Sequence, residues 1–266
     1  MPWTERQAAL LRGMGLRLWV PPTAPSPAVD TPAAPAPAPA PRSPVPAVAA
    51  SPAAAPAAQA AFVASGRGEV STLDWPALRQ AVADCRACSL CQSRRQTVFG
   101  TGHLQAQWLL VGEAPGEQED EQGEPFVGAA GHLLDRMLAA LGLTRAADGP
   151  QRPEQRVYIA NTLKCRPPRN RNPGAEELAS CEPFLVRQVE LLRPRLILAL
   201  GRFAVQALLR SDEPIGKLRG RVHHYEGVPV IVSYHPAYLL RSPHEKAKAW
   251  EDLCLAASVF DAGAAR

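Results

Sequence analysis

Four cysteines in this chain have the residue type and spacing that bind metal. Cys85 and Cys88 form a C-x2-C pair, and Cys165 and Cys181 follow much later in the chain. The chain starts without a secretory signal, so we expect a reducing, cytoplasmic compartment, where clustered thiolates hold metal rather than form disulfides. Thiolate ligands suit both a zinc ion and an iron–sulfur cluster, and the spacing does not decide between the two.

Two other cysteines and a cation-rich loop accompany this set. Cys91 forms a second C-x2-C with Cys88, which makes the ligand set ambiguous, and Cys254 is interpreted as an ordinary buried thiol. Cys165 is surrounded by cations, which indicates a metal that folds a phosphate-binding surface; the alternative is plain solvated charge. The cations are Lys164, Arg166, Arg169 and Arg171.

The elements that must position other reactive groups are four short apolar runs, which we interpret as buried strands. They lie at 108–111, 157–160, 196–200 and 230–232, with amphipathic helical patterns between them. This alternation predicts an α/β fold with a parallel sheet between helices. Ligands bind beyond the carboxyl ends of such strands, so the polar groups there should converge. The residues at these strand ends, with their backbone or side-chain polar groups, are Gly112, Glu113, Ala114 and Pro115 after the first run, Asn161 after the second and His235 after the fourth.

Several of these residues have the chemistry to hold a planar base, although each also has a structural interpretation. Phe126 is either a core residue under a glycine-rich loop or a stacking surface. Asn161 either caps a turn or reads the hydrogen-bonding edge of a pyrimidine. His235 precedes Leu239 and Leu240, which we expect in an exposed loop, where apolar side chains act as a wedge into a base stack.

The composition divides the chain into three parts. Residues 1–20 have the pattern of a short amphipathic helix, and residues 21–70 are rich in Pro and Ala, which predicts an extended, disordered linker. Residues 71–266 form the globular domain. The first helix is either a frayed or self-docked tail or a partner-binding peptide on a long arm, and we favour the partner-binding peptide.

The charge and hydropathy of the chain limit its partners. Net charge is only +4, so nucleic-acid binding must rest on local patches. No run of about 18 apolar residues occurs, so we expect no membrane span. We expect a monomer.

Taken in order, the motifs resemble the family 4 uracil-DNA glycosylases, the iron–sulfur branch of the uracil-DNA glycosylase superfamily. The resemblance covers about residues 82–260. The motifs are the C-x2-C pair, Gly-Glu-Ala-Pro-Gly-Glu-x-Glu-Asp, Pro-Phe-Val-Gly, Asn161 with Lys-Cys-Arg-Pro-Pro-x-Asn-Arg, Cys181, and His-Pro-x-Tyr-Leu-Leu-Arg. The resemblance implies a three-layer α/β/α sandwich around a four-stranded parallel sheet. It also implies a [4Fe-4S] cluster on Cys85, Cys88, Cys165 and Cys181, with Cys91 as a bystander.

The resemblance further implies hydrolysis of the N-glycosidic bond of uracil in DNA, with the base flipped into a pocket and an abasic site left behind. Phe126 would stack on uracil and Asn161 would select it over cytosine. His235 and backbone amides near Ala114 would stabilise the uracil anion. Glu113 or Glu119 would orient the water, and the residues alone do not choose between them.

The DNA contacts follow from the same resemblance. Leu239, with Leu240, would fill the gap left by the base. The phosphate contacts are Arg166, Arg169, Arg171 and Arg241, and Lys217, Arg219 and Arg221 would extend the patch. Gly112 and Pro115 would complete the substrate pocket. Two other functions stay open: a non-catalytic iron–sulfur DNA-binding module recruited to replication by its arm, and a glycosylase that takes a broader range of deaminated bases.

Overall fold

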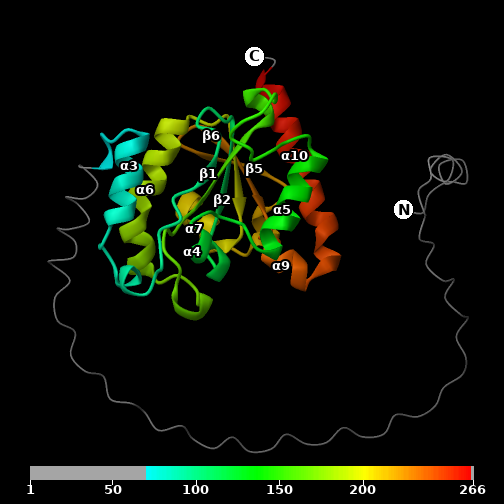
Figure 1. Cartoon of the computed structure of the whole chain (residues 1–266). Coiled ribbons are helices and arrows are strands. Elements are labelled where there is room, and N and C mark those ends of the chain that lie inside the picture. The colour runs from blue at the N-terminus through cyan, green and yellow to red at the C-terminus, as the bar shows by residue number, and fades with distance from the viewer. Residues whose placement is uncertain (1–69, 265–266) are drawn as a thin grey trace, which may run out of the picture. The chain divides into compact units, whose positions relative to one another are not determined.

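The computed structural model describes residues 70–264 (Figure 1). The helix expected over residues 1–20 and nearly all of the linker expected over residues 21–70 lie outside the described residues. The segment from Val70 onward contains every motif discussed above. No helix in this segment is both long and apolar enough to cross a membrane.

A six-stranded mixed sheet forms the centre of the described part, in the order β1-β3-β2-β4-β6-β5. The four predicted strands are its middle, and they pair in parallel. They are β2 (Trp108–Gly112), β3 (Val157–Asn161), β4 (Leu196–Leu200) and β6 (Val228–Ser233). The expected four-stranded sheet is therefore wrong in its strand number and in being wholly parallel.

Two antiparallel edge strands, β1 (Thr101–Gly102) and β5 (Val222–Tyr225), account for the difference. β1 has only two residues, and the residues of β5 alternate between exposed and partly buried. Neither strand therefore carries the continuous apolar run that marks a strand buried on both faces. Edge strands of this kind give no such signal in the sequence.

Helices cover both faces of the sheet. Successive strand residues point to opposite sides, and in β2, β3 and β4 the residues on both sides are buried. Leu109 and Val111 of β2 pack with α6 (Ala175–Leu192) and α7 (Arg202–Leu209). Trp108 and Leu110 of the same strand pack with α5 (Ala129–Ala140) and α10 (Lys246–Ala264). The two clusters produce three layers, helix, sheet and helix (Figure 1).

A third cluster lies beside the sheet, where α3 (Trp75–Asp84) packs against α6. It includes Leu78, Val82 and Phe184, and it also contains Cys165 and Cys181. The remaining short elements connect the layers. They are α4 (Glu117–Gln122), α8 (Ile215–Leu218), α9 (Pro236–Arg241), and the 3-10 turns η1 (Ser89–Gln92), η2 (Pro153–Gln155), η3 (Pro168–Asn170) and η4 (Pro243–Glu245).

Candidate active site

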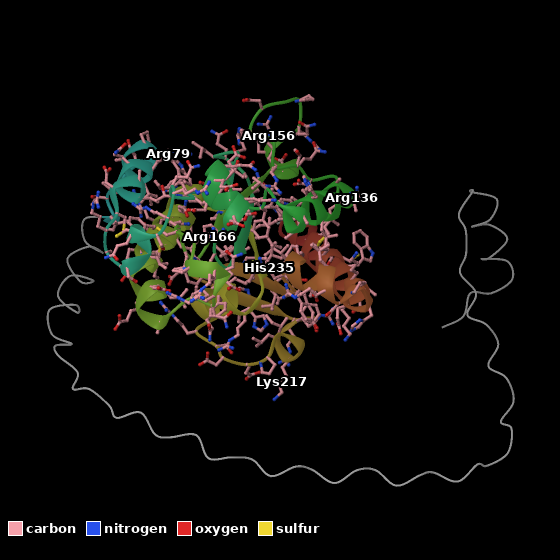
Figure 2. The ribbon with its side chains drawn as sticks, turned by 60° about the horizontal axis from the view of Figure 1, so that its bottom comes forward. Arg79, Arg136, Arg156, Arg166, Lys217 and His235 are labelled. Carbon is pink, nitrogen blue, oxygen red and sulfur yellow. The ribbon has the colours of Figure 1, made fainter. Side chains whose placement is uncertain are left out.

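A cleft of about 740 Å³ opens at the carboxyl ends of the parallel strands. It is lined by residues that follow all four central strands, as expected for an open α/β sheet. The predicted residues among them are Glu113, Ala114, Pro115, Glu119, Phe126, Asn161, Arg171, His235 and Arg241. In the view of Figure 2, His235 lies near the centre of the described part, and Lys217 lies near its lower edge.

Asn161 supplies the most unusual polar atom of the cleft. It ends β3 opposite Gly112 of β2, and only 3% of it is exposed. Within the described residues its Oδ1 is buried and has no hydrogen-bond partner. Such an atom costs about 1–3 kcal/mol when it stays unpaired, so its place in a cleft indicates that a ligand donor completes it.

Gly112 lies directly under this atom. A Cβ at residue 112 would be 2.4 Å from Asn161 Oδ1 and 2.7 Å from Phe126 Cζ. The close approach of backbone, amide and ring therefore requires glycine. It also places the Phe126 ring beside the Asn161 amide.

Phe126 is held in a conformation that a bulky residue rarely adopts, with φ of 56°. Two contacts maintain it. Gly131 of α5 packs so closely that a Cβ there would be 1.7 Å from the Phe126 carbonyl oxygen. The amides of Val127 and Gly128 donate to Glu119 Oε1 at 3.0 and 3.3 Å. The ring then stacks on the His235 imidazole, with centroids 5.3 Å apart and 29° between planes.

His235 caps α9, because its Nδ1 accepts a hydrogen bond from the Ala237 amide at 3.2 Å. In the neutral ring the proton is then on Nε2, which makes that nitrogen a donor. Burial, helped by the charge of Arg241, lowers the pKa of His235 to about 4. The imidazole is therefore neutral at physiological pH.

The two candidate acids differ in their surroundings. Both oxygens of Glu119 accept from backbone amides, since Oε2 also takes the Gly116 amide at 3.0 Å. Glu119 therefore joins two loops of the cleft. Glu113 lines the same cleft, and burial raises the pKa of its carboxyl while the charges of Arg202 and Arg241 oppose that effect. Among residues 70–264, no backbone amide donates to the Glu113 carboxylate.

The segment that carries the predicted wedge is a short helix, α9, and the expected exposed loop is wrong. His235 caps this helix, and a proline at its first turn has the fixed φ that suits a helix start. The helix turns Leu239 inward, where only 1% is exposed, and leaves Leu240 43% exposed. Leu240 is therefore the leucine that presents apolar surface to solvent.

The predicted phosphate-binding arginines have different partners. Arg171 lines the cleft and binds Glu177 with two hydrogen bonds, of 2.9 and 2.5 Å. Arg166 pairs with Glu117 at 3.2 Å. Arg169 lies in the exposed turn η3 with φ of 56°. Arg241 is exposed and lines the cleft.

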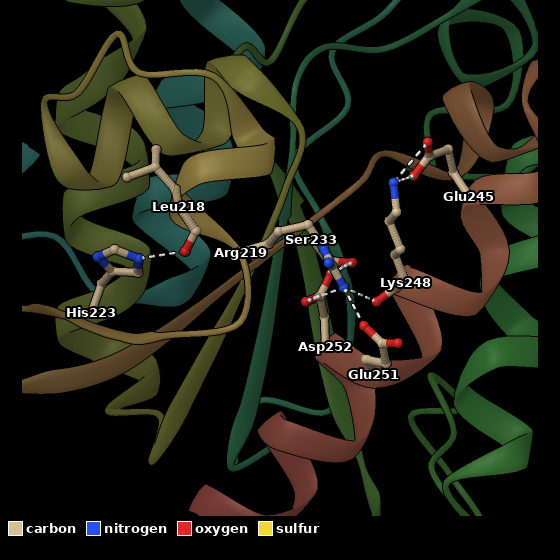
Figure 3. Close-up of polar contacts among 8 residues, drawn as sticks. All are labelled: Leu218, Arg219, His223, Ser233, Glu245, Lys248, Glu251 and Asp252. Atoms are coloured by element: carbon tan, nitrogen blue, oxygen red, sulfur yellow. Dashed lines mark hydrogen bonds and ion pairs between the residues drawn. The ribbon is translucent and has the colours of Figure 1, made fainter. Parts of the chain in front are cut away.

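Arg219, expected to extend the phosphate patch, is instead bound into the fold (Figure 3). Its Nε donates to the fully buried Asp252 of α10 at 3.1 Å, and a second nitrogen pairs with Glu251 at 3.2 Å. Ser233, at the end of β6, donates to the same Asp252 oxygen at 2.9 Å. This network fixes the end of the strand that leads into His235.

Sequence reasoning missed several residues that line the cleft. Arg202 follows Gly201 at the end of β4, and the strand-end rule would have found it. Tyr234 and Tyr238, which flank His235 in the motif but were given no role, also line the cleft, with ring centroids 5.1 Å apart and 36° between the planes. Ile215 comes from α8, which is too short to give a periodic signal.

A second, smaller pocket gathers the cysteines. Cys85, Cys88, Cys165 and Cys181 line it together with Cys91. Cys254 is exposed on α10, so its expected burial is wrong. In residues 70–264 no three potential ligands are arranged around one common ion position. The cysteines instead surround a pocket, and a multi-iron cluster, unlike a single ion, binds each thiolate at a separate iron.

The surroundings of the sulfurs fit bound thiolates. The Lys164 amide donates to Cys181 Sγ at 3.2 Å, and the Arg94 guanidinium donates to Cys165 Sγ at 3.1 Å. Burial raises the pKa of Cys181 to about 12 and also raises the pKa values of Cys88 and Cys165. Thiols in such a site ionise when a metal binds them. The donor set therefore fits an iron–sulfur cluster.

The fold and the cleft define an α/β protein with a polar cleft at its strand ends, and comparison with known proteins gives its family. Residues 99–254 match the family model described as the uracil DNA glycosylase superfamily. The chain is 45% identical to the type-4 uracil-DNA glycosylase of Archaeoglobus fulgidus over 61% of this chain and 81% of that protein. It is 38% identical to the type-4 enzyme of Pyrobaculum aerophilum over 69% of this chain and 93% of that protein. It is 42% identical to the type-4 enzyme of Thermotoga maritima over 60% of this chain and 80% of that protein. The chain belongs to the type-4 uracil-DNA glycosylases of this superfamily.

Proposed function

We propose that this protein removes uracil from DNA by hydrolysing its N-glycosidic bond, which releases free uracil and leaves an abasic site. The observation that carries the proposal is the buried, unpaired Oδ1 of Asn161 beside Phe126. Uracil offers an N3–H donor to that oxygen and an O4 acceptor to the amide nitrogen. Cytosine has an acceptor at N3 and a donor at C4, so it would leave both pairs unmade, at about 1–3 kcal/mol for each buried group.

The reaction requires the base outside the DNA stack, where Phe126 supplies the stacking surface. Water attacks the C1′ carbon, the bond from C1′ to N1 breaks, and the electron pair leaves with the base. The water loses a proton as the C1′ hydroxyl forms, and the uracil anion takes up one proton to become free uracil. The neutral His235 donates from Nε2 to the O2 oxygen, where negative charge develops. Glu113 orients the water. Ala114 contributes only its backbone, so no second acid stands next to Glu113 in the chain.

The DNA contacts belong to the same proposal. Leu240, exposed on α9 between the cleft residues Tyr238 and Arg241, fills the gap left by the flipped base, and Leu239 supports it from the core. Arg241 and Arg171 at the cleft contact phosphates next to the uracil, with Arg166 and Arg169 further along the strand. Gly112 and Pro115 shape the floor of the pocket.

We also propose that Cys85, Cys88, Cys165 and Cys181 hold a [4Fe-4S] cluster, with Cys91 as a bystander. The shared pocket and the donors to two of the sulfurs support this ligand set. When bound, the cluster supplies folding free energy by joining α3, the loop after β3 and α6. None of the six cysteines, all in the described part of the chain, forms a disulfide, which suits a reducing cytoplasm. The monomer and the partner of residues 1–20 remain predictions.

The test uses purified protein and an oligonucleotide with a single uracil, without added metal or nucleotide. Alkali-labile strand breaks should form at the uracil and not at cytosine or thymine in matched oligonucleotides. Asn161→Ala and His235→Ala should each reduce the rate strongly while the protein stays folded. Full activity in both variants would refute the residue roles, and intact uracil with the unaltered protein would refute the function.

A further inference from the structure

One buried cation connects the cysteine pocket with the base-reading amide. Lys164 is only 1% exposed, and its Nζ donates to the Asn161 carbonyl oxygen at 2.8 Å and to Gln188 Oε1 at 2.6 Å. The backbone amide of the same residue donates to Cys181 Sγ at 3.2 Å. Lys164 thus contacts the end of β3 with its side chain and a proposed cluster ligand with its backbone.

The partner of the ammonium is itself fixed from several sides. Gln188 of α6 is fully buried, and its Nε2 donates to the Phe99 carbonyl at 2.9 Å and to the Tyr158 hydroxyl at 3.4 Å. It lies two helical turns after Cys181 in the same helix, so both contacts of Lys164 on α6 share one face. The ammonium therefore has little freedom to move.

The charge of Lys164 lacks a carboxylate partner. Across residues 70–264 its Nζ makes no ion pair, and both of its acceptors are neutral oxygens. The nearby groups that can carry negative charge are the sulfurs of Cys181 and Cys165, which become anionic when they bind metal. A buried ammonium is costly unless negative charge lies close by. Thiolates that hold a cluster supply that charge.

We propose that Lys164 is a positioning residue for Asn161, and that it makes the uracil-reading amide depend on the filled cysteine pocket. The inference rests on the proposed function. A hydrogen bond to the main-chain oxygen of Asn161 fixes the last residue of β3, and with it the direction in which the Asn161 side chain leaves the strand. Loss of the ammonium allows this strand end to shift, and Asn161 Oδ1 no longer meets the base.

The experiment is a double-mutant cycle of Lys164→Met and Asn161→Ala, with the exposed Lys246→Met as the matched control. The readouts are kcat and KM on single-uracil DNA, inhibition by free uracil, and iron and sulfide content. Lys164→Met should lower kcat/KM about 10- to 100-fold per iron-loaded protein, as for other residues that orient a site residue. In the Asn161→Ala background the same change should cost less than about threefold.

A second pair of variants separates positioning from folding. Lys164→Met with Gln188→Met replaces both polar partners by apolar groups, which restores much of the stability that the single change removes. Activity should stay low in this double variant although thermal stability returns. Recovery of activity together with stability, additive effects in the cycle, or full activity of Lys164→Met would each refute the positioning role. Absence of uracil release from both the unaltered protein and Lys246→Met would instead refute the proposed function itself.

Discussion

His235 is prepared as a neutral donor by its position in the chain. It ends a buried strand and caps α9, so its Nδ1 is occupied by the Ala237 amide. Burial and the nearby Arg241 oppose protonation. A neutral imidazole suits a reaction in which negative charge appears on the departing base, because the donor itself needs no proton uptake from solvent.

The pH dependence follows from this lowered pKa. The pKa of His235 falls from 6.5 to about 4 on folding, so the unfolded chain binds more protons between these values. His235 therefore contributes to a loss of stability as pH falls through that window, and not above it. Single-turnover rates should show no titration near 6.5 and should decline only as pH approaches 4. A rate that falls with a midpoint near 6.5, absent in His235→Gln, would contradict the assignment.

A single added carbon atom at Gly112 should impair the substrate pocket. Gly112→Ala places a methyl group against Asn161 Oδ1 and the Phe126 ring. We expect kcat/KM on uracil DNA to fall about 100-fold, since displacement of positioning groups by about 1 Å has such an effect. Gly263→Ala near the end of α10 is the control, because the nearest atom to its Cβ is the far end of Arg195 at 3.5 Å. Equal activity of the two variants would show that the floor of the pocket tolerates a side chain.

At the scale of elements, the central strands could be predicted because each is a continuous apolar run between polar strand ends. The same rule located Glu113, Asn161 and His235, since the carboxyl ends of parallel strands meet at one edge. The edge strands β1 and β5 and the helix α9 could not be predicted in this way. They are too short or too exposed for periodicity, and their form depends on pairing with β3, β6 and α5.

The helix α9 separates the roles of its two leucines. Leu239→Ala should destabilise the protein by about 2–5 kcal/mol, because the side chain is buried, and denaturant unfolding measures this. Leu240→Ala should leave stability unchanged and should lower activity more on double-stranded than on single-stranded uracil DNA, because a single strand has no stack to fill. An equal loss of activity on double-stranded and single-stranded DNA would show that Leu240 does not act as the wedge.

At the scale of the whole molecule, the cysteines of the second pocket come from segments that are not strands of the sheet. Cys85 ends α3, Cys165 follows β3 and Cys181 lies in α6, so a bound cluster links the start of the described part to its centre. Cys165→Ser should reduce iron content, thermal stability and activity together. Cys91→Ser is the matched control from the same pocket and should retain all three. Iron loss in Cys91→Ser would make Cys91 a ligand.

The Pro/Ala-rich region predicts an independent arm. Deletion of residues 1–68 should leave the uracil-release rate on a short oligonucleotide unchanged, because every residue assigned to the reaction follows Val70. The comparison is made at equal iron content. A large loss of rate on the bare oligonucleotide would mean that the arm takes part in catalysis.

The distance along the chain between the proposed ligands also affects how this protein is made. Cys85 and Cys88 leave the ribosome long before Cys181, which lies beyond two of the four central strands. During that interval the first two thiols have no partners with which to hold iron. Synthesis therefore passes through a stage that oxidants attack more easily than the finished protein, and the yield of active repair enzyme should depend on how well the cell controls oxygen and supplies iron during translation.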